Sequence, residues 1–293
     1  MLYYSAYSLR IGSEIPLPEL LPAAGGGDVD IRLAEPRPLA GAQSIRWRAH
    51  PEAEARFRYP RAGQFQVSRG REVVVTPEPG AESTLLRLYV QGMMLAAILH
   101  QRGLFVLHSS IVTVHGRGIA FVGSVGAGKS TLASGFHARG YPVVTDDNAA
   151  IDMQNLPPAI VPAFPSLKIY PEVAAALGYQ RSDLRPVHES QVKHAQSVAD
   201  GFTTAPVPLH AIYVLDREAS AEVSRLSVIE TITELIRHSV PTRWGVAGDG
   251  AHLRMCARLA GCVPVYRVRT FRTLQEIRGV LDCILNHHEG AAR

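Results

Sequence analysis

The stretch GSVGAGKS, from Gly123 to Ser130, fills every required position of the phosphate-loop pattern G-x-x-x-x-G-K-[ST]. The preceding residues IAFVG (119–123) form a short apolar run that is typical of a buried strand. The following residues TLASGFHARG (131–140) carry apolar side chains at helical spacing and end on a glycine. Backbone N–H groups curl around phosphate oxygens in such a strand–loop–helix setting. The sequence therefore predicts a nucleotide-binding loop here.

Two side chains of this loop have specific predicted roles. Lys129 would reach the β- and γ-phosphates of ATP, and the Ser130 hydroxyl would ligate Mg²⁺ at the start of the helix. ATP and Mg²⁺ are accordingly the expected cofactors. The residues predicted to bind the nucleotide are Gly123, Ser124, Val125, Gly126, Ala127, Gly128, Lys129, Ser130 and Thr131.

Lysine is rare in this chain, because only Lys129, Lys168 and Lys193 occur among thirty basic residues. Arginine replaces lysine wherever either residue serves, so the remaining lysines are candidate positions for a compact ammonium group. We expect Lys168 and Lys193 to contact a phosphate or the substrate, and ordinary solvated lysines are the alternative for both.

The composition is that of a globular protein of 293 residues, with 46% hydrophobic residues and a net charge of +4. The arginines are scattered and form no long basic run, so nucleic acid is not an expected partner. The sequence lacks a signal-like start and a long apolar span, so we expect a cytoplasmic protein without membrane contact. Its three cysteines have no C-x-x-C spacing, which favours reduced, buried thiols.

The expected organisation is an α/β nucleotide domain preceded by a β-rich module. Residues 1–80 contain short alternating segments separated by Gly, Pro and Asp, and are predicted to form the β-rich N-terminal module. Residues 81–103 are apolar nearly all round a helix and should form a buried connecting helix. Residues 104–293 alternate between strand-like and helix-like segments and form the predicted P-loop domain.

Two acids follow the next strand-like segment, YPVVT (141–145). Asp146 lies seventeen residues after Lys129, which leaves room for one helix and one strand, so Asp146 and Asp147 should end a neighbouring strand near the loop. One carboxylate could accept the proton of an acceptor hydroxyl while the other organises Mg²⁺. Successive strand residues face opposite sides, so both acids can serve only if the chain turns there.

Several other segments carry weaker expectations. Lys168 is expected in a Pro-bracketed loop before a short helix from Glu172, and Lys193 in a polar stretch. Arg237 is expected to hold a substrate carboxylate or phosphate. The pair His287 and His288 is expected to be exposed to solvent, because adjacent helical residues face different directions.

Other phosphate-loop classes fit less well. The chain has no N-K-x-D string of the kind that guanine-specific GTPases carry and no LSGGQ-like signature of transport ATPases. Small-molecule kinases similar to shikimate kinase share the early acid pair, so that alternative stays open on spacing.

The segment from Leu107 to Ile151 resembles the core of the HPr kinase/phosphorylase family. The matching positions are His108, the loop Gly123 to Ser130, Arg139-Gly140-Tyr141 and Asp146-Asp147. The resemblance implies an HPr-kinase-like P-loop fold, Asp146 as catalytic base, Asp147 with Ser130 as metal ligands, and His108 and Lys129 as further catalytic residues. Because relatives often form rings, it also allows a homo-oligomer.

The chain departs from that family in three places. Thr131 stands where the family usually has Glu, and neither the R-G-x-G signature nor the C-terminal arginine motif is found, so we expect phosphorylation without dephosphorylation. SEIPLPEL (13–20) and FPSLKIYPE (164–172) resemble HPr-kinase-related proteins such as lasso-peptide precursor kinases. The resemblance implies a serine kinase for a peptide or protein, with a ribosomal (lasso-type) precursor peptide as the expected acceptor. The alternatives are a carrier-protein kinase, a small-molecule kinase and a non-catalytic ATP-binding regulatory module.

Overall fold

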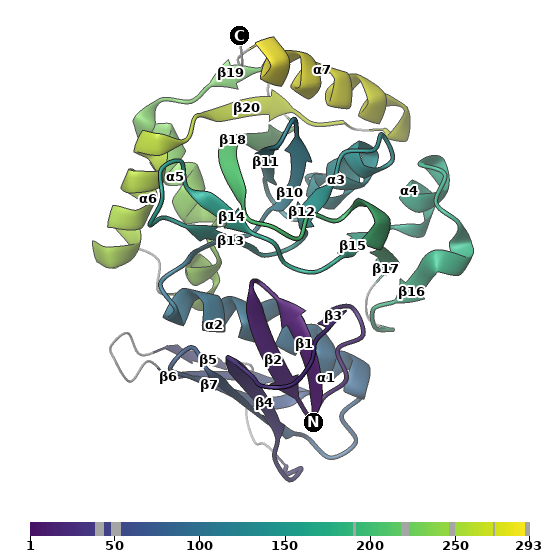
Figure 1. Ribbon diagram of the computed structural model, residues 1–293, viewed down its shortest axis with the longest axis vertical. Helices are drawn as coiled ribbons and strands as arrows, with labels where there is room; N and C mark the ends of the chain where they lie inside the picture. The colour runs from purple at the N-terminus through teal and green to yellow at the C-terminus, as the bar shows by residue number, and fades with distance from the viewer. Residues whose placement is uncertain are drawn as a thin grey trace.

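The computed structural model describes residues 1–38, 44–47, 54–189, 192–217, 223–245, 250–271 and 273–290. The described chain is a mixed α/β structure with two large sheets, one in the lower half and one in the upper half of Figure 1. A helical segment lies between the two sheets. This arrangement matches the mixed α/β class that the sequence predicts.

The first sheet is built from the N-terminal segment. Its described strands run in the order β3-β1-β2-β4-β8-β7-β6-β5. Alternation creates its inner face: in β7 every second residue is buried, including Phe65 and Val67, because successive side chains point to opposite faces. The strands are β1 Leu2–Ala6, β2 Leu9–Ser13, β3 Leu21–Pro22, β4 Val29–Leu33, β5 Ser44–Trp47, β6 Glu54–Tyr59, β7 Gly63–Ser68 and β8 Glu72–Pro77.

The helical segment that follows the first sheet is interrupted by one π-helical stretch. It comprises α1 Ser83–Tyr89, the π-helix η1 Val90–Met94 and α2 Leu95–Gln101. Residues 95–99 are all buried, as expected for a helix that is apolar nearly all round. This segment joins the core of the first sheet to Val106 and Phe164 of the second half, so the two halves share one hydrophobic cluster.

The second sheet carries the glycine-rich loop. In its described part the strand order is β12-β10-β11-β18-β14-β13-β9, and β20 pairs with β18 and with β19. Since β10 is antiparallel to both β11 and β12, the latter two run in the same direction and end at the same edge. The strands are β9 Phe105–Leu107, β10 Ser110–Val114, β11 Arg117–Val122, β12 Val143–Thr145, β13 Ala149–Asp152, β14 Ala159–Val161, β18 Val207–Asp216, β19 Ser224–Arg225 and β20 Val265–Arg269.

Helices cover both faces of the second sheet. Apolar residues of α3 and α7 pack in one cluster with β10 and β11, and those of α5 and α6 pack in another (Figure 1). A small sheet in the order β15-β17-β16 flanks α3 and α4. The remaining elements are α3 Lys129–His137, α4 Pro171–Ala176, α5 Val228–His238, α6 Gly250–Cys262, α7 Ile277–Gly290, β15 Ser166–Ile169, β16 Leu184–Pro186, β17 His194–Ser197 and the 3₁₀ turns Arg181–Asp183, Ala199–Gly201, Val240–Trp244 and Leu274–Glu276.

Several local predictions are wrong. Lys168 lies on β15 and not in a loop, because Ser166–Ile169 pairs along its length with β17. The acids follow β12, which is separated from β11 by β10 and is therefore not its direct neighbour. Among the cysteines, Cys256 is buried but Cys262 is exposed.

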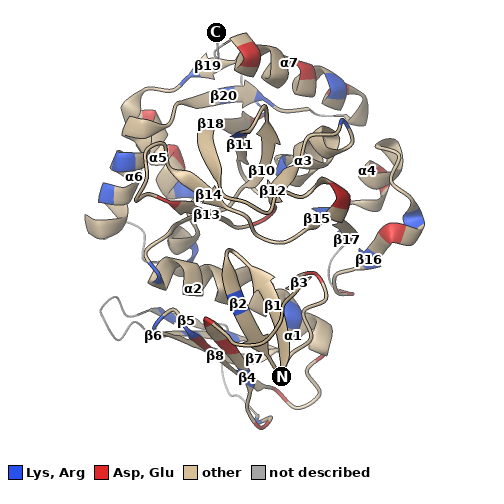
Figure 2. Ribbon diagram, in the orientation of Figure 1, with Lys and Arg blue, Asp and Glu red and all other residues tan. Residues whose placement is uncertain are grey.

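Charged residues are interspersed on the surface. Figure 2 shows Lys and Arg beside Asp and Glu in both halves of the molecule, in keeping with the scattered arginines of the sequence. Among the described residues, no helix is both long enough and apolar enough to span a bilayer.

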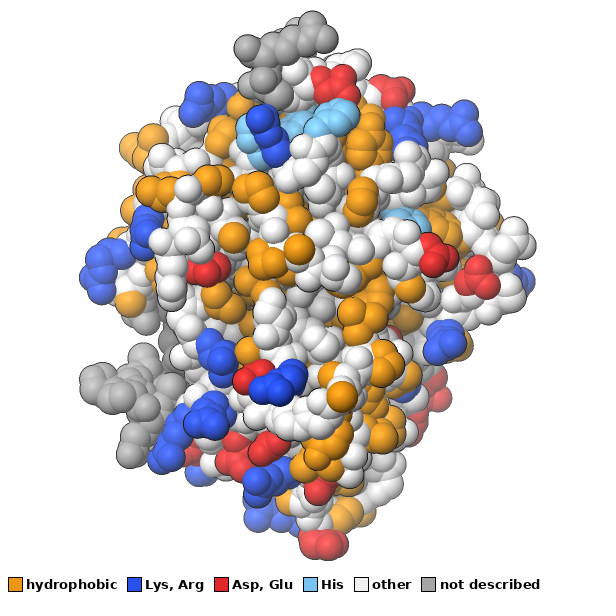
Figure 3. Space-filling view, viewed as in Figure 1, with side chains coloured by type: hydrophobic (Ala, Val, Ile, Leu, Met, Phe, Trp, Pro, Cys, Tyr) orange, Lys and Arg blue, Asp and Glu red, His pale blue; other side chains and the backbone are white. Residues whose placement is uncertain are grey.

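His288 is buried, which contradicts the expectation that the terminal histidine pair is solvent-exposed. Its side chain is 3% exposed, and its ring centroid lies 4.9 Å from that of His210. The adjacent His287 accepts or donates a hydrogen bond with the Tyr213 hydroxyl at 3.0 Å. Histidine side chains gather beside α7 at the top of Figure 3. Both histidines therefore contact residues of β18, on the side of α7 that packs against the sheet.

Burial lowers the pKa of His288 to about 4, and the nearby His210, Arg117, His115 and His287 add to this shift. The imidazole therefore stays neutral in the folded protein at pH values at which it is protonated in the unfolded chain, whose pKa is 6.5. The free energy of unfolding should fall as the pH drops from about 6.5 to about 4.

Replacing the buried imidazole tests this pH dependence. Between pH 7 and 4 the free energy of unfolding should decrease less in His288→Gln than in wild type, by on the order of 2 kcal/mol, because glutamine does not titrate. Urea unfolding of both proteins at several pH values between 7 and 4 measures it. His194→Gln, at a half-exposed histidine, serves as the control. Parallel stability curves for wild type and His288→Gln would contradict this account.

Candidate functional site

The glycine-rich loop connects β11 to α3 at the edge where the parallel strands end. Gly128 has φ +103°, and a Cβ atom added there would lie 2.7 Å from the Phe271 ring. A side chain at this position would meet both backbone strain and a steric clash. Glycine is therefore required for the loop to turn directly into α3.

The loop is held through its carbonyl groups. Lys129 Nζ donates to the carbonyls of Gly123 at 2.9 Å and Ser124 at 3.2 Å. The Thr270 hydroxyl donates to the Ala127 carbonyl at 2.7 Å. The first N–H groups of α3 have no partner within their own helix. The loop therefore directs carbonyls toward protein donors and leaves helix N-terminal N–H groups as potential anion donors.

This loop lines a cavity of about 200 Å³ together with the acid pair. Four further polar side chains of this cavity come from outside the loop and the acid pair. His108 follows β9, Ser110 begins β10, Lys168 lies on β15 and Lys193 precedes β17. The lining residues are His108, Ser110, Val125, Gly126, Gly128, Lys129, Ser130, Thr131, Asp146, Asp147, Lys168, Tyr170, Val173, Lys193 and Phe271.

A turn after β12 directs both acids toward this cavity. The strand ends at Thr145, and Asp147 adopts φ +80°, a left-handed conformation that is uncommon for a residue other than glycine. Consecutive strand residues would have faced opposite sides of the sheet. The turn is therefore the reason that Asp146 and Asp147 both line the same cavity.

Hydrogen bonds from distant segments hold this turn. The Asn148 carbonyl accepts from the Thr145 hydroxyl at 2.7 Å and from the Tyr7 hydroxyl at 3.0 Å. The Asn148 side-chain amide donates to the Gly92 carbonyl of the π-helix at 2.9 Å. His108 Nδ1 lies 2.7 Å from the Asp147 carbonyl. The first sheet and the connecting helices therefore contribute directly to the geometry of the acid pair.

Asp146 is buried, with 6% exposure, and its two oxygens have separate donors. The Ser110 hydroxyl donates to Oδ1 at 2.5 Å, and the Lys168 backbone N–H donates to Oδ2 at 2.9 Å. Because both bonds come from strand residues, the carboxylate is held in one orientation. Each oxygen retains a further lone pair for a ligand or a proton.

Asp147 forms the ionic centre of the cavity. Lys168 Nζ lies 2.8 Å from its Oδ2, and His108 Nδ1 lies 3.2 Å from its Oδ1. Burial by itself raises the pKa of Asp147, but the Lys168 ammonium and the His108 ring more than offset burial and hold this pKa well below its usual range. Burial lowers the pKa of Lys168, yet Asp147 outweighs it and the net pKa is raised. Both partners are therefore charged at neutral pH.

The two other predicted lysines have different surroundings. Burial lowers the pKa of Lys129 to about 8, although the Asp146 carboxylate acts in the opposite direction. Lys193 Nζ lies 5.2 Å from the centroid of the Tyr170 ring, within the range of a cation–π contact. All three lysines of the chain thus line one cavity.

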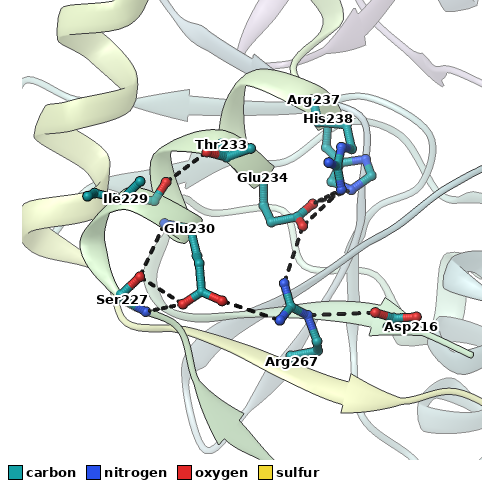
Figure 4. A network of polar contacts seen from close by, with 9 residues as sticks. All are labelled: Asp216, Ser227, Ile229, Glu230, Thr233, Glu234, Arg237, His238 and Arg267. Carbon is teal, nitrogen blue, oxygen red and sulfur yellow. Dashed lines mark hydrogen bonds and ion pairs between the residues drawn. The ribbon is translucent and has the colours of Figure 1, made fainter. Parts of the chain in front are cut away.

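Arg237 is not brought to the cavity. Figure 4 shows it in a polar network on α5, where its Nη1 lies 3.0 Å from Glu234 Oε1. Arg267 approaches the same Glu234 carboxylate at 3.5 Å. Arg237 is also 62% exposed at its side chain. Its position is explained by stabilisation of α5, and it does not lie among the residues that line the acid pair.

Sequence reasoning missed several residues of the site. Ser110 and Asn148 are next to predicted positions, and their polar side chains at strand ends were a signal that could have been used. Tyr7, Tyr170 and Phe271 gave no such signal. They reach the site only through tertiary packing, in the case of Tyr7 across 141 residues of sequence.

The site has the donor set for an anion and a hard cation. Loop N–H groups and Lys129 suit an anion such as phosphate, whereas the Ser130 hydroxyl and the carboxylates of Asp146 and Asp147 are the oxygen ligands that Mg²⁺ prefers. These groups lie in one cavity, so the arrangement can hold both together.

Comparisons with known proteins give a remote structural relationship. No protein-family model matches the chain, and no curated protein matches it. Among solved structures, the HPr(Ser) kinase/phosphatase from Coxiella burnetii is similar with a TM-score of 0.37 and 12% sequence identity, over 64% of this chain and 92% of that chain. A likeness of this size carries no functional argument.

Removing the ammonium of Lys168 tests the ionic centre. Lys168→Met should lower the free energy of unfolding by about 1–3 kcal/mol, because the partly buried Asp147 carboxylate loses its strongest partner. Urea unfolding at neutral pH measures this loss. The matched control Lys193→Met removes the cation–π contact with Tyr170 and should cost less than about 1 kcal/mol.

A double variant checks the assignment of the pair. Adding Asp147→Asn to Lys168→Met should recover part of the lost stability, because no uncompensated charge remains. Equal losses for Lys168→Met and Lys193→Met would show that the Asp147–Lys168 contact contributes nothing measurable.

Proposed function

We propose that the protein is an ATP-dependent phosphotransferase that phosphorylates a serine hydroxyl of a peptide or protein. The observation that carries this proposal is the meeting of the glycine-rich loop and the pair Asp146 and Asp147 in one cavity. Phosphoryl transfer requires mainly positioning and neutralisation of charge, and a place for the acceptor proton. The cavity has groups suited to each task.

The loop would bind the phosphates of ATP. In the structure Lys129 donates to the carbonyls of Gly123 and Ser124, and rotation of its side chain would carry the ammonium toward the β- and γ-phosphates. Burial holds its pKa at about 8, and a neighbouring polyphosphate favours the charged form. The N–H groups at the start of α3 complete the anion site.

Ser130 and Asp147 are the residues that would hold Mg²⁺. Their hydroxyl and carboxylate oxygens fit the preference of this ion, and Asp147 stays ionised because of Lys168 and His108. When bound, Mg²⁺ would neutralise charge on the phosphates. Lys168 would then keep Asp147 oriented, and His108 would keep the Asp147 backbone in its turn.

Asp146 is the better candidate for the base. Asp147 has a strongly lowered pKa and accepts protons poorly, since the Lys168 ammonium stabilises its charged form. Within the described residues, the hydrogen bonds that Asp146 accepts come from neutral donors, the Ser110 hydroxyl and the Lys168 backbone N–H. Its fixed orientation allows a free lone pair to accept the proton of the acceptor hydroxyl.

The proposed acceptor is a serine hydroxyl of a peptide or protein. Nothing in the described residues singles out a ribosomal precursor peptide, lasso-type or otherwise, or a carrier protein. A non-catalytic ATP-binding switch would use the same loop but would not need a base. The role of Asp146 therefore separates an enzyme from a switch.

Substitution of Asp146 tests the proposal. Asp146→Asn should lower the rate of phosphoryl transfer by roughly 10²–10⁴-fold, the usual contribution of general base catalysis. Its affinity for ATP should stay within about threefold of wild type, because the phosphates contact the loop and Lys129. Transfer is measured with labelled ATP and separate pools of peptides and metabolites, and affinity by calorimetry.

Two further variants serve as comparisons for Asp146→Asn. Lys129→Met should lose affinity for ATP, whereas Asp152→Asn, a carboxamide control on β13, should behave as wild type. Unchanged transfer by Asp146→Asn would reject its role as base. Label only in metabolites would reject a peptide or protein acceptor and leave a small-molecule kinase.

A further inference from the structure

A small recess opens beside the acid pair. It has a volume of about 20 Å³ and shares Asp146, Asp147 and Lys168 with the cavity of the glycine-rich loop. Its opposite wall includes Tyr7 and Glu19 of the first sheet's segment and Gln91 of the π-helix. The acids therefore face two spaces, one bordered by the loop and one bordered by the N-terminal half.

A much larger groove borders the recess. This groove has a volume of about 660 Å³ and shares Glu19, Ser166 and Ala195 with the recess. One side is formed by residues 18–22, which include β3, and the other side by β17 and the residues after it. Shared lining residues thus connect the groove with the recess that Asp146 borders.

The sizes of the two spaces limit what can enter. A volume of about 20 Å³ accommodates roughly one water-sized group, such as the hydroxyl end of a serine side chain. A whole metabolite would not fit there, whereas the groove outside is large enough for several residues of a chain. The geometry therefore favours a small hydroxyl side chain presented by a longer molecule.

We propose that the groove binds an extended polypeptide segment in which basic residues flank a serine, and that the serine hydroxyl enters the recess beside Asp146. This inference rests on the proposed phosphotransferase function. It assigns the acceptor site to the interface between the N-terminal half and β17.

Backbone groups along the groove suit an extended segment. Among the described strands, β3 lies at the edge of the first sheet beside β1, and its residues Leu21 and Pro22 line the groove. Because β3 has two residues and Pro22 has no N–H, this edge can offer carbonyl acceptors to a bound segment but not a full ladder of hydrogen bonds. On the other side, Gln196 is 4% exposed, and its Oε1 has no hydrogen-bond partner within the described part of the chain. Gln196 therefore brings an unused acceptor to the wall of the groove.

Charge gives the groove a preference. Its lining includes the acids Glu19, Asp183 and Asp200 and a single arginine, Arg185. Glu19 is partly compensated, because Arg87 lies 3.7 Å from it. Asp183 and Asp200 are exposed and remain available to cations. Complementary charge therefore favours lysine or arginine near the serine.

The proposed transfer needs two reactants, ATP and the acceptor serine. The serine oxygen forms a bond to the γ-phosphorus of ATP, and the bond from this phosphorus to the β–γ bridging oxygen breaks with its electron pair going to ADP. The hydroxyl proton moves to the Asp146 carboxylate and then to solvent. The products are phosphoserine in the segment and ADP.

A positional library of serine peptides tests the charge preference. With labelled ATP and Mg²⁺, wild type should phosphorylate peptides with flanking Arg or Lys several-fold better than peptides with flanking Asp or Glu. Asp183→Asn combined with Asp200→Asn should reduce this preference by roughly fivefold, in keeping with the modest strength of exposed ion pairs. The control Glu72→Gln, on β8 and outside the groove, should leave it unchanged.

A second variant tests the entrance to the recess. Ala195→Leu places a larger side chain where groove and recess meet, outside the lining of the loop cavity. It should lower kcat/KM for peptides at least tenfold and leave ATP affinity within about threefold of wild type. Its thermal unfolding is compared with wild type, and the exposed aspartate variants decide the question if this variant does not fold.

The outcomes separate this inference from the proposed function. Three results would overturn the groove assignment and leave the proposed phosphotransferase function intact. They are phosphorylation of peptides without a charge preference, a charge preference that the double aspartate variant retains, and full activity of folded Ala195→Leu on peptides. Label only in metabolites would also overturn it. Binding of ATP without transfer to any pool would reject the proposed function and, with it, this inference.

Discussion

The turn at Asp146 and Asp147 is the constraint on which the site depends. Two consecutive acids at a strand end would face opposite sides, and the left-handed conformation of Asp147 brings both to one cavity. This conformation is unfavourable for a residue with a side chain, so other contacts must compensate. Bonds from His108 and from the partners of Asn148 provide them, and Lys168 pairs with the Asp147 carboxylate.

This constraint explains why the N-terminal half is integrated with the rest of the molecule. The β1–β2 hairpin places Tyr7 against the turn, where its hydroxyl bonds to Asn148 and its N–H bonds to the Pro162 carbonyl. The π-helical stretch supplies the Gly92 carbonyl to the same asparagine. A shared hydrophobic cluster adds packing across the two halves. The first sheet therefore supports the acid pair as well as bordering its recess.

The sequence predicted the local part of this arrangement well. The phosphate-loop pattern, the adjacent strand and helix, and the spacing to the acids depend on short-range rules, and the structure has β11, α3 and β12 at these places. Predictions failed where the tertiary structure decides. Lys168 lies on a strand because its segment pairs with β17, and His288 is buried because α7 packs on β18. Tyr7 could not be found, since its contact spans most of the first half of the chain.

The most direct test of the central claim is a structure of the protein with Mg²⁺ and a non-hydrolysable ATP analogue. The account predicts the triphosphate in the cavity of the glycine-rich loop, with Lys129 moved from the carbonyls of Gly123 and Ser124 to the phosphates and the γ-phosphate facing Asp146. A nucleotide bound elsewhere, or bound while Lys129 stays on those carbonyls and Asp146 faces away from the γ-phosphate, would contradict it.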